Sequence, residues 1–267
     1  MKELIDTIKY YFRRIDFILN KLIPRKKCNV CERKFHHFMA FRNGNGKPSA
    51  FVAELDYMTG NIDEFACPYC QSIDRERLIF LFFDKLKLWQ AFENADVLHF
   101  APETCLRKRI EDLNPREYIK ADLFSGEPGI AKIDVMEIPF PDDHFDFVLC
   151  CHVLEHVSDE NRALAELRRV LKPGGYGVLQ TPFSRFLTHT FQDPSINTEP
   201  LRWSYYGQED HVRLFGRDLF DKIKDAGFVL DLKLHADFFS AEETSRYGLC
   251  GKEDLILVVK PQDSIIN

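Results

Sequence analysis

The sequence has little of what marks membrane-spanning, secreted or nucleic-acid-coating proteins. It has no run approaching the roughly 18 uninterrupted apolar residues of a membrane-spanning helix. Charges interrupt the apolar positions near its start, so no signal-peptide core forms. It also lacks a basic excess: the net charge of −6 argues against a nucleic-acid binder with a basic overall surface. No internal repeat or low-complexity run is present. These absences lead us to expect a cytoplasmic protein.

The chain has 267 residues, which suits one large or two unequal domains. Hydrophobic residues make up 45% and charged residues 29%, a composition typical of a globular chain that buries a sizeable core. We divide the chain into an amphipathic basic helix at 1–27, a four-cysteine zinc module with a linker helix at 28–94, and an α/β domain at 95–267.

Residues 3–23 have the pattern of one amphipathic helix. Apolar residues recur at three- and four-residue steps, and Pro24 ends the pattern. The opposite face is basic, which allows two interpretations. The helix packs on its own protein, or it lies on an anionic membrane surface and makes the protein membrane-peripheral.

Four of the eight cysteines form two pairs, Cys28 with Cys31 and Cys67 with Cys70. A two-residue gap lets both thiolates face one ion, and two such pairs complete a tetrahedral Zn²⁺ shell. Such a shell is closed to water, so we predict a structural zinc site in a zinc-ribbon-like fold. The 35 residues between the pairs exceed the commonest spacing of about 15–20. Redox thiols or chance pairing are the alternatives, with His36 and His37 as reserve ligands.

From residue 95 onward, strand and helix patterns alternate, which predicts a doubly wound, Rossmann-like, mostly parallel sheet. The predicted strands are Asp96–Phe100, Glu117–Ala121, Lys132–Val135, Phe145–Cys150, Tyr176–Gln180, Phe228–Leu234 and Asp254–Val259. The predicted helices are 72–94, Thr104–Leu113, Asp159–Leu171 and Arg217–Ala226. Ligands of such sheets bind outside the carboxyl ends of the strands.

Three segments carry a resemblance to a known family: PFPDDHFDFVLCCHVLEHV (Pro139–Val157), LRRVLKPGGYGVLQTPF (Leu167–Phe183) and DHVRLFGRDLFDKIKDAGF (Asp210–Phe228). They resemble class I methyltransferases that use S-adenosylmethionine (SAM), in the type 11-like branch. The resemblance implies a seven-stranded sheet with an antiparallel last strand and SAM across the strand tips. It further implies that Asp122 holds the ribose, Asp134 contacts adenine with Val135 packed beside it, and His152 lies by the methionine end.

The first loop departs from the family pattern. His99 stands where the family has an acid, and Ala101, Glu103 and Cys105 stand where it has glycines. Glycine permits close backbone approach and positive φ. We expect Ala101 and Glu103 still to border the methionine part of SAM, where a carboxylate attracts the α-ammonium.

A general base is needed only where the methyl acceptor loses a proton, and histidine is the side chain most easily tuned near neutral pH. His156 follows His152 by one predicted helical turn, so both share a face, and it is our first candidate base. His211 is the second. The alternatives are helix packing for His156, a surface histidine for His211, and a divalent metal bound by Glu155 and His156 with a further acid.

Three functions compete. The first is methyl transfer to an oxygen or nitrogen of a small molecule or of a glycan or lipid-linked precursor. The second is methylation of RNA or protein with the zinc module as reader. The third is a non-catalytic binding protein whose first loop is too altered for SAM. The long aromatic segment 183–207 either shapes the acceptor site or forms satellite core.

Overall fold

A computed structural model describes residues 25–44, 47–58 and 60–262. The helix predicted at 3–23 lies outside these residues. The chain forms two compact units, each built from separate stretches. Unit 1 comprises residues 1–47, 60–81 and 239–251, and unit 2 comprises residues 48–59, 82–238 and 252–267. The division into contiguous ranges made from the sequence stays a prediction. No helix among the described residues is both long and apolar enough to cross a membrane.

Unit 1 is small and is organised around the paired cysteines. Its strands β1 (Lys26–Lys27) and β2 (Lys34–Phe35) form an antiparallel hairpin that carries the first cysteine pair in its turn. Its core consists of Phe35 and Phe38 with Cys28 and Cys67. The other elements are η1 (Phe41–Gly44), η2 (Ile62–Glu64), α9 (Ala241–Tyr247) and the first part of α3 (Asp74–Leu86).

One arginine ties the separate stretches of unit 1 together. Arg77 of α3 is fully buried, and its guanidinium stacks 3.9 Å from the centre of the Phe38 ring. It donates hydrogen bonds to five main-chain carbonyls, those of Glu64, Phe65, Ser72, Tyr247 and Gly248. Because arginine offers five donors in a fixed fork, one side chain satisfies carbonyls from two of the three stretches, and its stacking on Phe38 adds the third.

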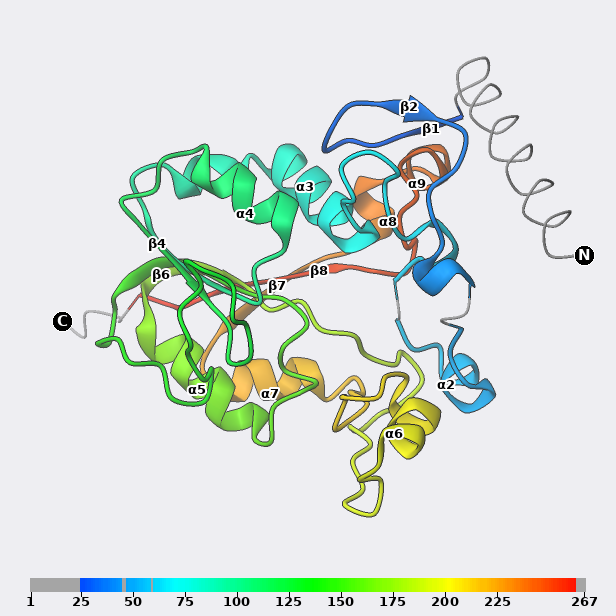
Figure 1. Cartoon of the computed structure of the whole chain (residues 1–267). Coiled ribbons are helices and arrows are strands. Elements are labelled where there is room, and N and C mark those ends of the chain that lie inside the picture. The colour runs from blue at the N-terminus through cyan, green and yellow to red at the C-terminus, as the bar shows by residue number, and fades with distance from the viewer. Residues whose placement is uncertain (1–24, 45–46, 59, 263–267) are drawn as a thin grey trace, which may run out of the picture. The chain divides into compact units, whose positions relative to one another are not determined.

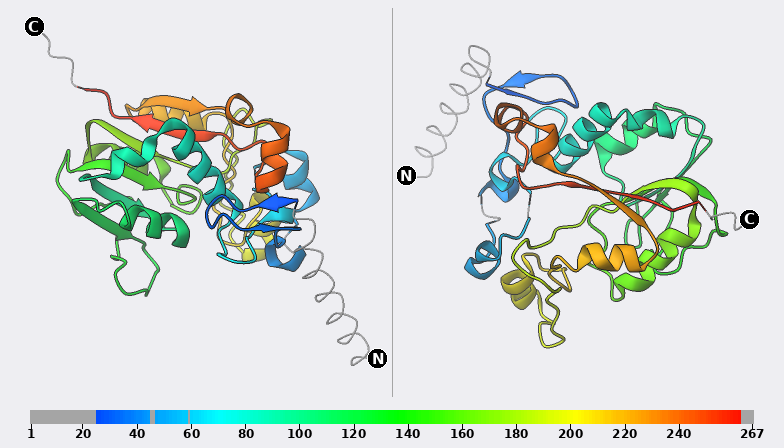
Figure 2. Two further views of the ribbon diagram at one scale, coloured as in Figure 1. Left: turned by 90° about the horizontal axis from the view of Figure 1, so that it is seen from above. Right: turned by 180° about the vertical axis from the view of Figure 1, so that it is seen from behind.

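Unit 2 contains a six-stranded sheet of order β4-β3-β5-β6-β8-β7. All strands run parallel except β8, which is antiparallel to both neighbours. Helix α4 (Thr104–Glu111) covers one face, and α5 (Glu160–Val170) and α7 (Leu219–Asp225) cover the other (Figures 1 and 2). The predicted doubly wound sheet with an antiparallel last strand is therefore confirmed. The strands are β3 (Asp96–Phe100), β4 (Glu117–Ala121), β5 (Phe145–Cys150), β6 (Leu171–Val178), β7 (Val229–Lys233) and β8 (Leu255–Val259).

The expectation of seven strands is wrong by one. The segment predicted as a strand at Lys132–Val135 forms only bridges, from Ala131 to Ala121 and from Asp134 to Glu137. The reason lies in Asp134, whose carboxylate accepts a hydrogen bond from the Met136 amide at 2.8 Å. This side-chain bond closes a turn that competes with strand pairing.

One predicted helix is shorter in the structure, and one strand is interrupted. The helix expected over 72–94 ends at Leu86, because Lys87 adopts a left-handed φ of 57°, and a 3₁₀ turn, η3 (Leu88–Phe92), follows. In β6, the Lys172–Gly175 segment interrupts the pairing with β5. Phe145 pairs with Leu171, and Phe147 pairs with Tyr176, so the segment bulges between these two contacts.

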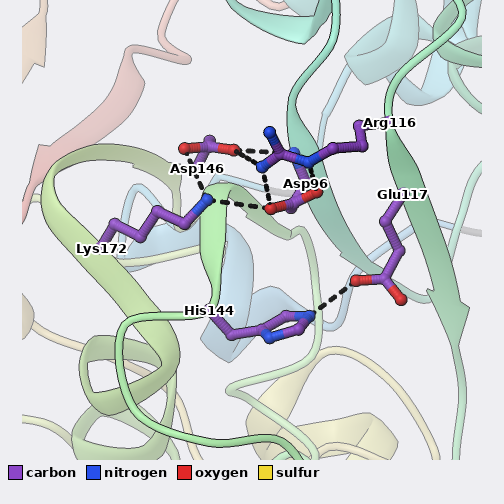
Figure 3. A network of polar contacts seen from close by, with 6 residues as sticks. All are labelled: Asp96, Arg116, Glu117, His144, Asp146 and Lys172. Atoms are coloured by element: carbon purple, nitrogen blue, oxygen red, sulfur yellow. Dashed lines mark hydrogen bonds and ion pairs between the residues drawn. The ribbon is translucent and has the colours of Figure 1, made fainter.

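Charged side chains join the amino ends of four strands (Figure 3). Lys172 of β6 lies 2.9 Å from carboxylate oxygens of both Asp96 in β3 and Asp146 in β5. Arg116, next to β4, donates to both carboxylates. The hydrogen bond from Arg116, with help from Lys172, lowers the pKa of Asp96 to about 2 despite the opposing effect of burial. The network fixes strand order at the end of the sheet opposite the carboxyl ends.

The aromatic segment after β6 forms a satellite core within unit 2. A short helix, α8 (His235–Phe238), follows β7 elsewhere in the unit. In the satellite core, helices α2 (Ala50–Glu54) and α6 (Glu199–Tyr206) pack together. Buried Val52, Tyr57, Tyr206 and Leu214 fill the space between them. The segment 183–207 thus supplies core through Tyr206, while Phe186 is largely exposed.

Candidate functional site

A pocket of about 650 Å³ opens at the carboxyl ends of β3, β4 and β5 in unit 2, a volume suited to a nucleoside-sized ligand. This is the edge at which parallel sheets bind ligands. Six residues predicted from the sequence lie in its lining, namely Ala101, Asp122, Asp134, Val135, His152 and His156. The other lining residues are Phe100, Leu123, Phe124, Ile133, Met136, Val153, Val157, Ser158, Arg202, Asp210 and Val212.

The backbone turns sharply where β3 and β5 enter the pocket. Ala101 has φ of 46° and His152 has φ of 56°, both in the left-handed region that non-glycine residues rarely adopt. Main-chain hydrogen bonds hold them, from the Ala101 amide to the Ala121 carbonyl (2.8 Å) and from the His152 amide to the Gln180 carbonyl (2.6 Å). Ala101 therefore takes the conformation that a glycine would take at this position. Strained backbone of this kind clusters at ligand sites.

The two predicted carboxylates each organise a tight loop beside the pocket. One oxygen of Asp122, Oδ1, accepts hydrogen bonds from the amides of Phe124 and Ser125, each at 2.7 Å. Asp134 likewise uses Oδ1 for the Met136 amide. These hydrogen bonds hold each carboxylate against its own loop. In both residues the bonding oxygen is Oδ1.

Glu103 lies outside the residues that line the pocket. Its Oε2 lies 3.2 Å from Nε2 of His99, whose Nδ1 lies 2.8 Å from the Tyr118 hydroxyl. His99 is fully buried. His99, which stands where the family pattern has an acid, is thus paired with Glu103.

The segment after β5 is a turn, and the helical spacing expected between His152 and His156 is wrong. The His156 amide bonds to the Val153 carbonyl at 3.0 Å, and α5 begins only at Glu160, capped by Asp159. Buried Arg213 fixes this turn by donating to the carbonyls of Leu154, Val157 and Ser158. The turn still presents His152 and His156 to the same pocket.

Behind the pocket wall, Glu155 is buried among histidines. Its Oε1 lies 3.3 Å from Nδ1 of His152 and 4.0 Å from Nε2 of His156, and its Oε2 accepts from the Thr181 hydroxyl at 2.6 Å. Burial works to raise the pKa of Glu155, but the close contact with His152 and the charges of the nearby histidines outweigh it, so the pKa lies below its ordinary value.

His211 does not line the pocket and is only 2% exposed. Its ring meets the His156 ring edge-on, with centroids 4.8 Å apart. Burial lowers the pKa of His211, which favours the neutral ring. The two candidate bases are therefore in contact, with His156 at the pocket and His211 behind it.

Sequence reasoning did not identify two members of this site, Tyr57 and Glu253. Tyr57 is buried near Glu155, and its pKa is raised well above the ordinary value, first by burial and then by the Glu155 charge. Glu253 Oε1 lies 4.0 Å from His152 Nε2. Both are far from the motif segments along the chain, and no local pattern distinguishes them.

The four paired cysteines of unit 1 meet in one cluster, with their sulfurs within 4.8 Å of one another. The Sγ atoms of Cys28 and Cys70 are 3.7 Å apart, and those of Cys31 and Cys67 are 3.8 Å apart. A tetrahedral ion with sulfurs at about 2.3 Å requires sulfur separations of about 3.8 Å. The cluster therefore has the dimensions of a four-thiolate metal site.

The two cysteine turns are built alike. The Cys28 amide bonds to the carbonyl five residues on, at Arg33, and the Cys67 amide does the same to Ser72. In both turns the residue after the second cysteine is left-handed, with φ of 61° at Glu32 and 63° at Gln71. Local backbone conformation thus aims all four sulfurs at one point.

Comparisons with known proteins find methyltransferases. Residues 98–179 match the family described as "Methyltransferase domain". "Ubiquinone/menaquinone biosynthesis C-methyltransferase UbiE" of Psychromonas ingrahamii is 36% identical over 78 residues, which are 28% of this chain and 31% of that protein. The protein of the same name from Bordetella avium is 48% identical over 56 residues, 21% of this chain and 22% of that protein. The matches thus span about a third or less of these relatives.

Solved structures give the same kind of neighbour at lower identity. A SAM-dependent methyltransferase from Mesorhizobium loti is 14% identical, covering 67% of this chain and 97% of that one, with a TM-score of 0.48. A putative methyltransferase from Bacillus halodurans is 18% identical, covering 67% and 99%, with a TM-score of 0.42.

Proposed function

We propose that the protein, whose residues 98–179 match the family described as "Methyltransferase domain", transfers a methyl group from SAM to an oxygen or nitrogen of a small-molecule or glycan acceptor. One observation carries the proposal. The pocket brings together the two acids and the apolar side chain expected for a nucleoside, Asp122 from the loop after β4 and Asp134 with Val135 from the loop before β5.

The charge and shape of the pocket fit this cofactor. Its ionisable lining comprises three carboxylates, those of Asp122, Asp134 and Asp210, one arginine, Arg202, and two histidines. A net negative lining attracts the sulfonium and ammonium charges of SAM. Ile133, Val135 and Met136 offer apolar surface to the adenine ring. The left-handed turn at Ala101 brings backbone, rather than a side chain, toward the ligand.

Bound SAM supplies a methyl group that is already activated for in-line displacement. The chain then has to orient the acceptor, exclude water and remove a proton where the acceptor is a hydroxyl. His156 is placed for the last task, because it lines the pocket and Nδ1 lies 3.4 Å from Asp210 Oδ2. The contact with Asp210 holds the ring in place.

The proposal is tested by incubating the protein with methyl-labelled SAM and panels of hydroxylated, amino and saccharide acceptors. Label transfer to at least one class supports it. SAM binding without transfer to any class would favour a non-catalytic binding protein.

A second candidate is transfer to carbon, which the printed names of the UbiE relatives favour. In that case a phenolic or quinol ring is the acceptor, and the same base assists by removing a proton. Mass spectrometry and NMR of the labelled product distinguish a methyl on carbon from one on oxygen or nitrogen.

We further propose that Zn²⁺ occupies the cluster of Cys28, Cys31, Cys67 and Cys70. Support comes from the sulfur separations, which match a tetrahedral shell, and from the two similar turns. Four thiolates leave no ligand position for water or substrate, so the ion stabilises unit 1 and takes no part in the chemistry.

A further inference from the structure

A second cluster of ligand-type side chains lies in unit 2, apart from the cysteines. Glu155, His156 and His211 each offer one donor atom, and these three atoms lie within 4.8 Å of one another. Glu155 and His156 come from the turn after β5, and His211 comes from the segment after α6. Two nitrogens and one carboxylate oxygen are a donor set typical of catalytic divalent metal sites.

The tautomer of His211 is the first observation that points to an ion. Its Nδ1 lies 3.0 Å from the Tyr206 carbonyl, which can only accept, so Nδ1 carries the proton. The other nitrogen, Nε2, then holds a lone pair. It is buried and has no hydrogen-bond partner among the described residues. A histidine whose Nδ1–H is held by a carbonyl and whose Nε2 is available is the usual form of a metal ligand.

Glu155 gives the second observation. The residue is 1% exposed, and His152 Nδ1 lies 3.3 Å from its Oε1 without making an aligned hydrogen bond, so among the described residues this oxygen has an ion-pair contact but no hydrogen-bond donor. Leaving a buried carboxylate oxygen without a donor is costly. The neighbouring Tyr57 hydroxyl is also buried with no partner in residues that the structure describes. A cation with a bound water would satisfy all three atoms at once.

His156 completes the set and connects it to the pocket. Its Nδ1 faces the Asp210 carboxylate, an outer partner that would orient the ring toward an ion. Its Nε2 lies 4.0 Å from Glu155 Oε1. Ligand atoms around a four-coordinate ion lie about 3.3 Å apart, so the three side chains need to approach by at most about 1.5 Å.

We propose that Glu155, His156 and His211 bind one divalent transition-metal ion at the wall of the pocket. Three protein ligands leave at least one coordination position free. Because His156 lines the pocket, that position is available to an oxygen atom of the methyl acceptor. With the ion bound, His156 acts as a ligand in place of the role of base proposed above. The metal site stands without the methyltransferase proposal, whereas its role in holding the acceptor rests on it.

Mn²⁺ is the probe of choice, because it prefers oxygen and nitrogen donors and leaves the thiolate cluster to zinc. The full chain, with its zinc retained, is titrated with Mn²⁺, and free Mn²⁺ is followed by electron paramagnetic resonance. We expect one bound ion per chain. Glu155→Gln and His211→Gln should each weaken binding by at least about tenfold. His189→Gln, a change at an exposed histidine, should leave it unchanged.

Two outcomes would overturn the proposal: no Mn²⁺ bound at millimolar concentration, or undiminished binding in His211→Gln. Circular dichroism confirms that each variant is folded. Should a variant fail to fold, the Co²⁺ spectrum of the wild-type protein decides. Visible bands without thiolate charge transfer support a nitrogen–oxygen site, and their absence refutes it. Since no measurement here uses SAM, failure of the methyltransferase proposal would appear separately.

Discussion

At the scale of single residues, the chain reaches a glycine-like turn with few glycines. Ala101 lies in the left-handed region, where a Cβ atom costs roughly 1–2 kcal/mol. Its hydrogen bond to the Ala121 carbonyl and the pairing of β3 with β4 hold it there. Strain at this position is consistent with a loop shaped for close approach of a ligand.

Ala101→Gly should therefore stabilise the protein, by about 0.5–1 kcal/mol after the greater chain entropy of glycine is deducted. Denaturant unfolding measures the change. Ala163→Gly, in the middle of α5, is the matched control and should destabilise by about 1 kcal/mol. If both changes destabilise equally, the Ala101 conformation does not store strain.

At the scale of elements, the sequence predicted the bounds of the regular strands, but it did not predict the turns and loops that connect them. Strands β3, β4 and β5 have the bounds that buried apolar runs predict. The segment 132–135 failed as a strand because one aspartate side chain bonded its own loop. The turn at 152–158 was mistaken for a helix because its carbonyls are satisfied by Arg213, which lies 55 residues or more away in sequence.

The ion network at the amino ends of the strands makes stability depend on pH. Because the pKa of Asp96 is lowered to about 2 from 3.8, its stabilising effect is complete above about pH 4 and is lost as pH falls toward 2. Asp96→Asn should cost about 2 kcal/mol at pH 7. The difference from wild type should shrink between pH 4 and 2.

Urea unfolding at several pH values measures this difference. Asp221→Asn removes an exposed carboxylate of α7 and should change stability by less than about 0.5 kcal/mol throughout. A cost for Asp96→Asn that stays constant down to pH 2 would show that the carboxylate charge is not what stabilises the sheet.

If zinc occupies the cysteine cluster as proposed, the two cysteine turns of unit 1 depend on a shared ion. We expect one zinc per chain by elemental analysis, and Cys67→Ser should lose it together with cooperative unfolding of unit 1. Cys105→Ser, in α4 of unit 2, should retain the zinc. Wild-type protein without zinc, and with all four thiols free, would contradict the assignment.

At the scale of the whole molecule, the sequence predicted a ligand pocket at one edge of the sheet, but it did not predict every residue around that pocket. Asp122, Asp134, Val135 and His152 line one pocket because parallel strands end at a common edge. Tyr57 and Glu253 lie beside this pocket only because of the tertiary structure. They belong to residues 48–59 and 252–267, which are part of unit 2 although they are distant in sequence from the motif segments. The cluster of Glu155, His156 and His211 likewise could not be predicted from the sequence, because the contact between His156 and His211 forms only in the tertiary structure.

The central claim is that Asp122 and Asp134 hold a nucleoside cofactor in this pocket. Titration calorimetry with SAM tests it on wild type, Asp122→Asn, Asp134→Asn and the control Asp221→Asn. The amide in each pocket variant can still accept its loop hydrogen bonds, so the fold should persist. We predict saturable 1:1 binding, weakened roughly tenfold or more in each pocket variant and unchanged in the control. Absence of binding to wild type at millimolar SAM, or equal affinity in all four proteins, would contradict the account.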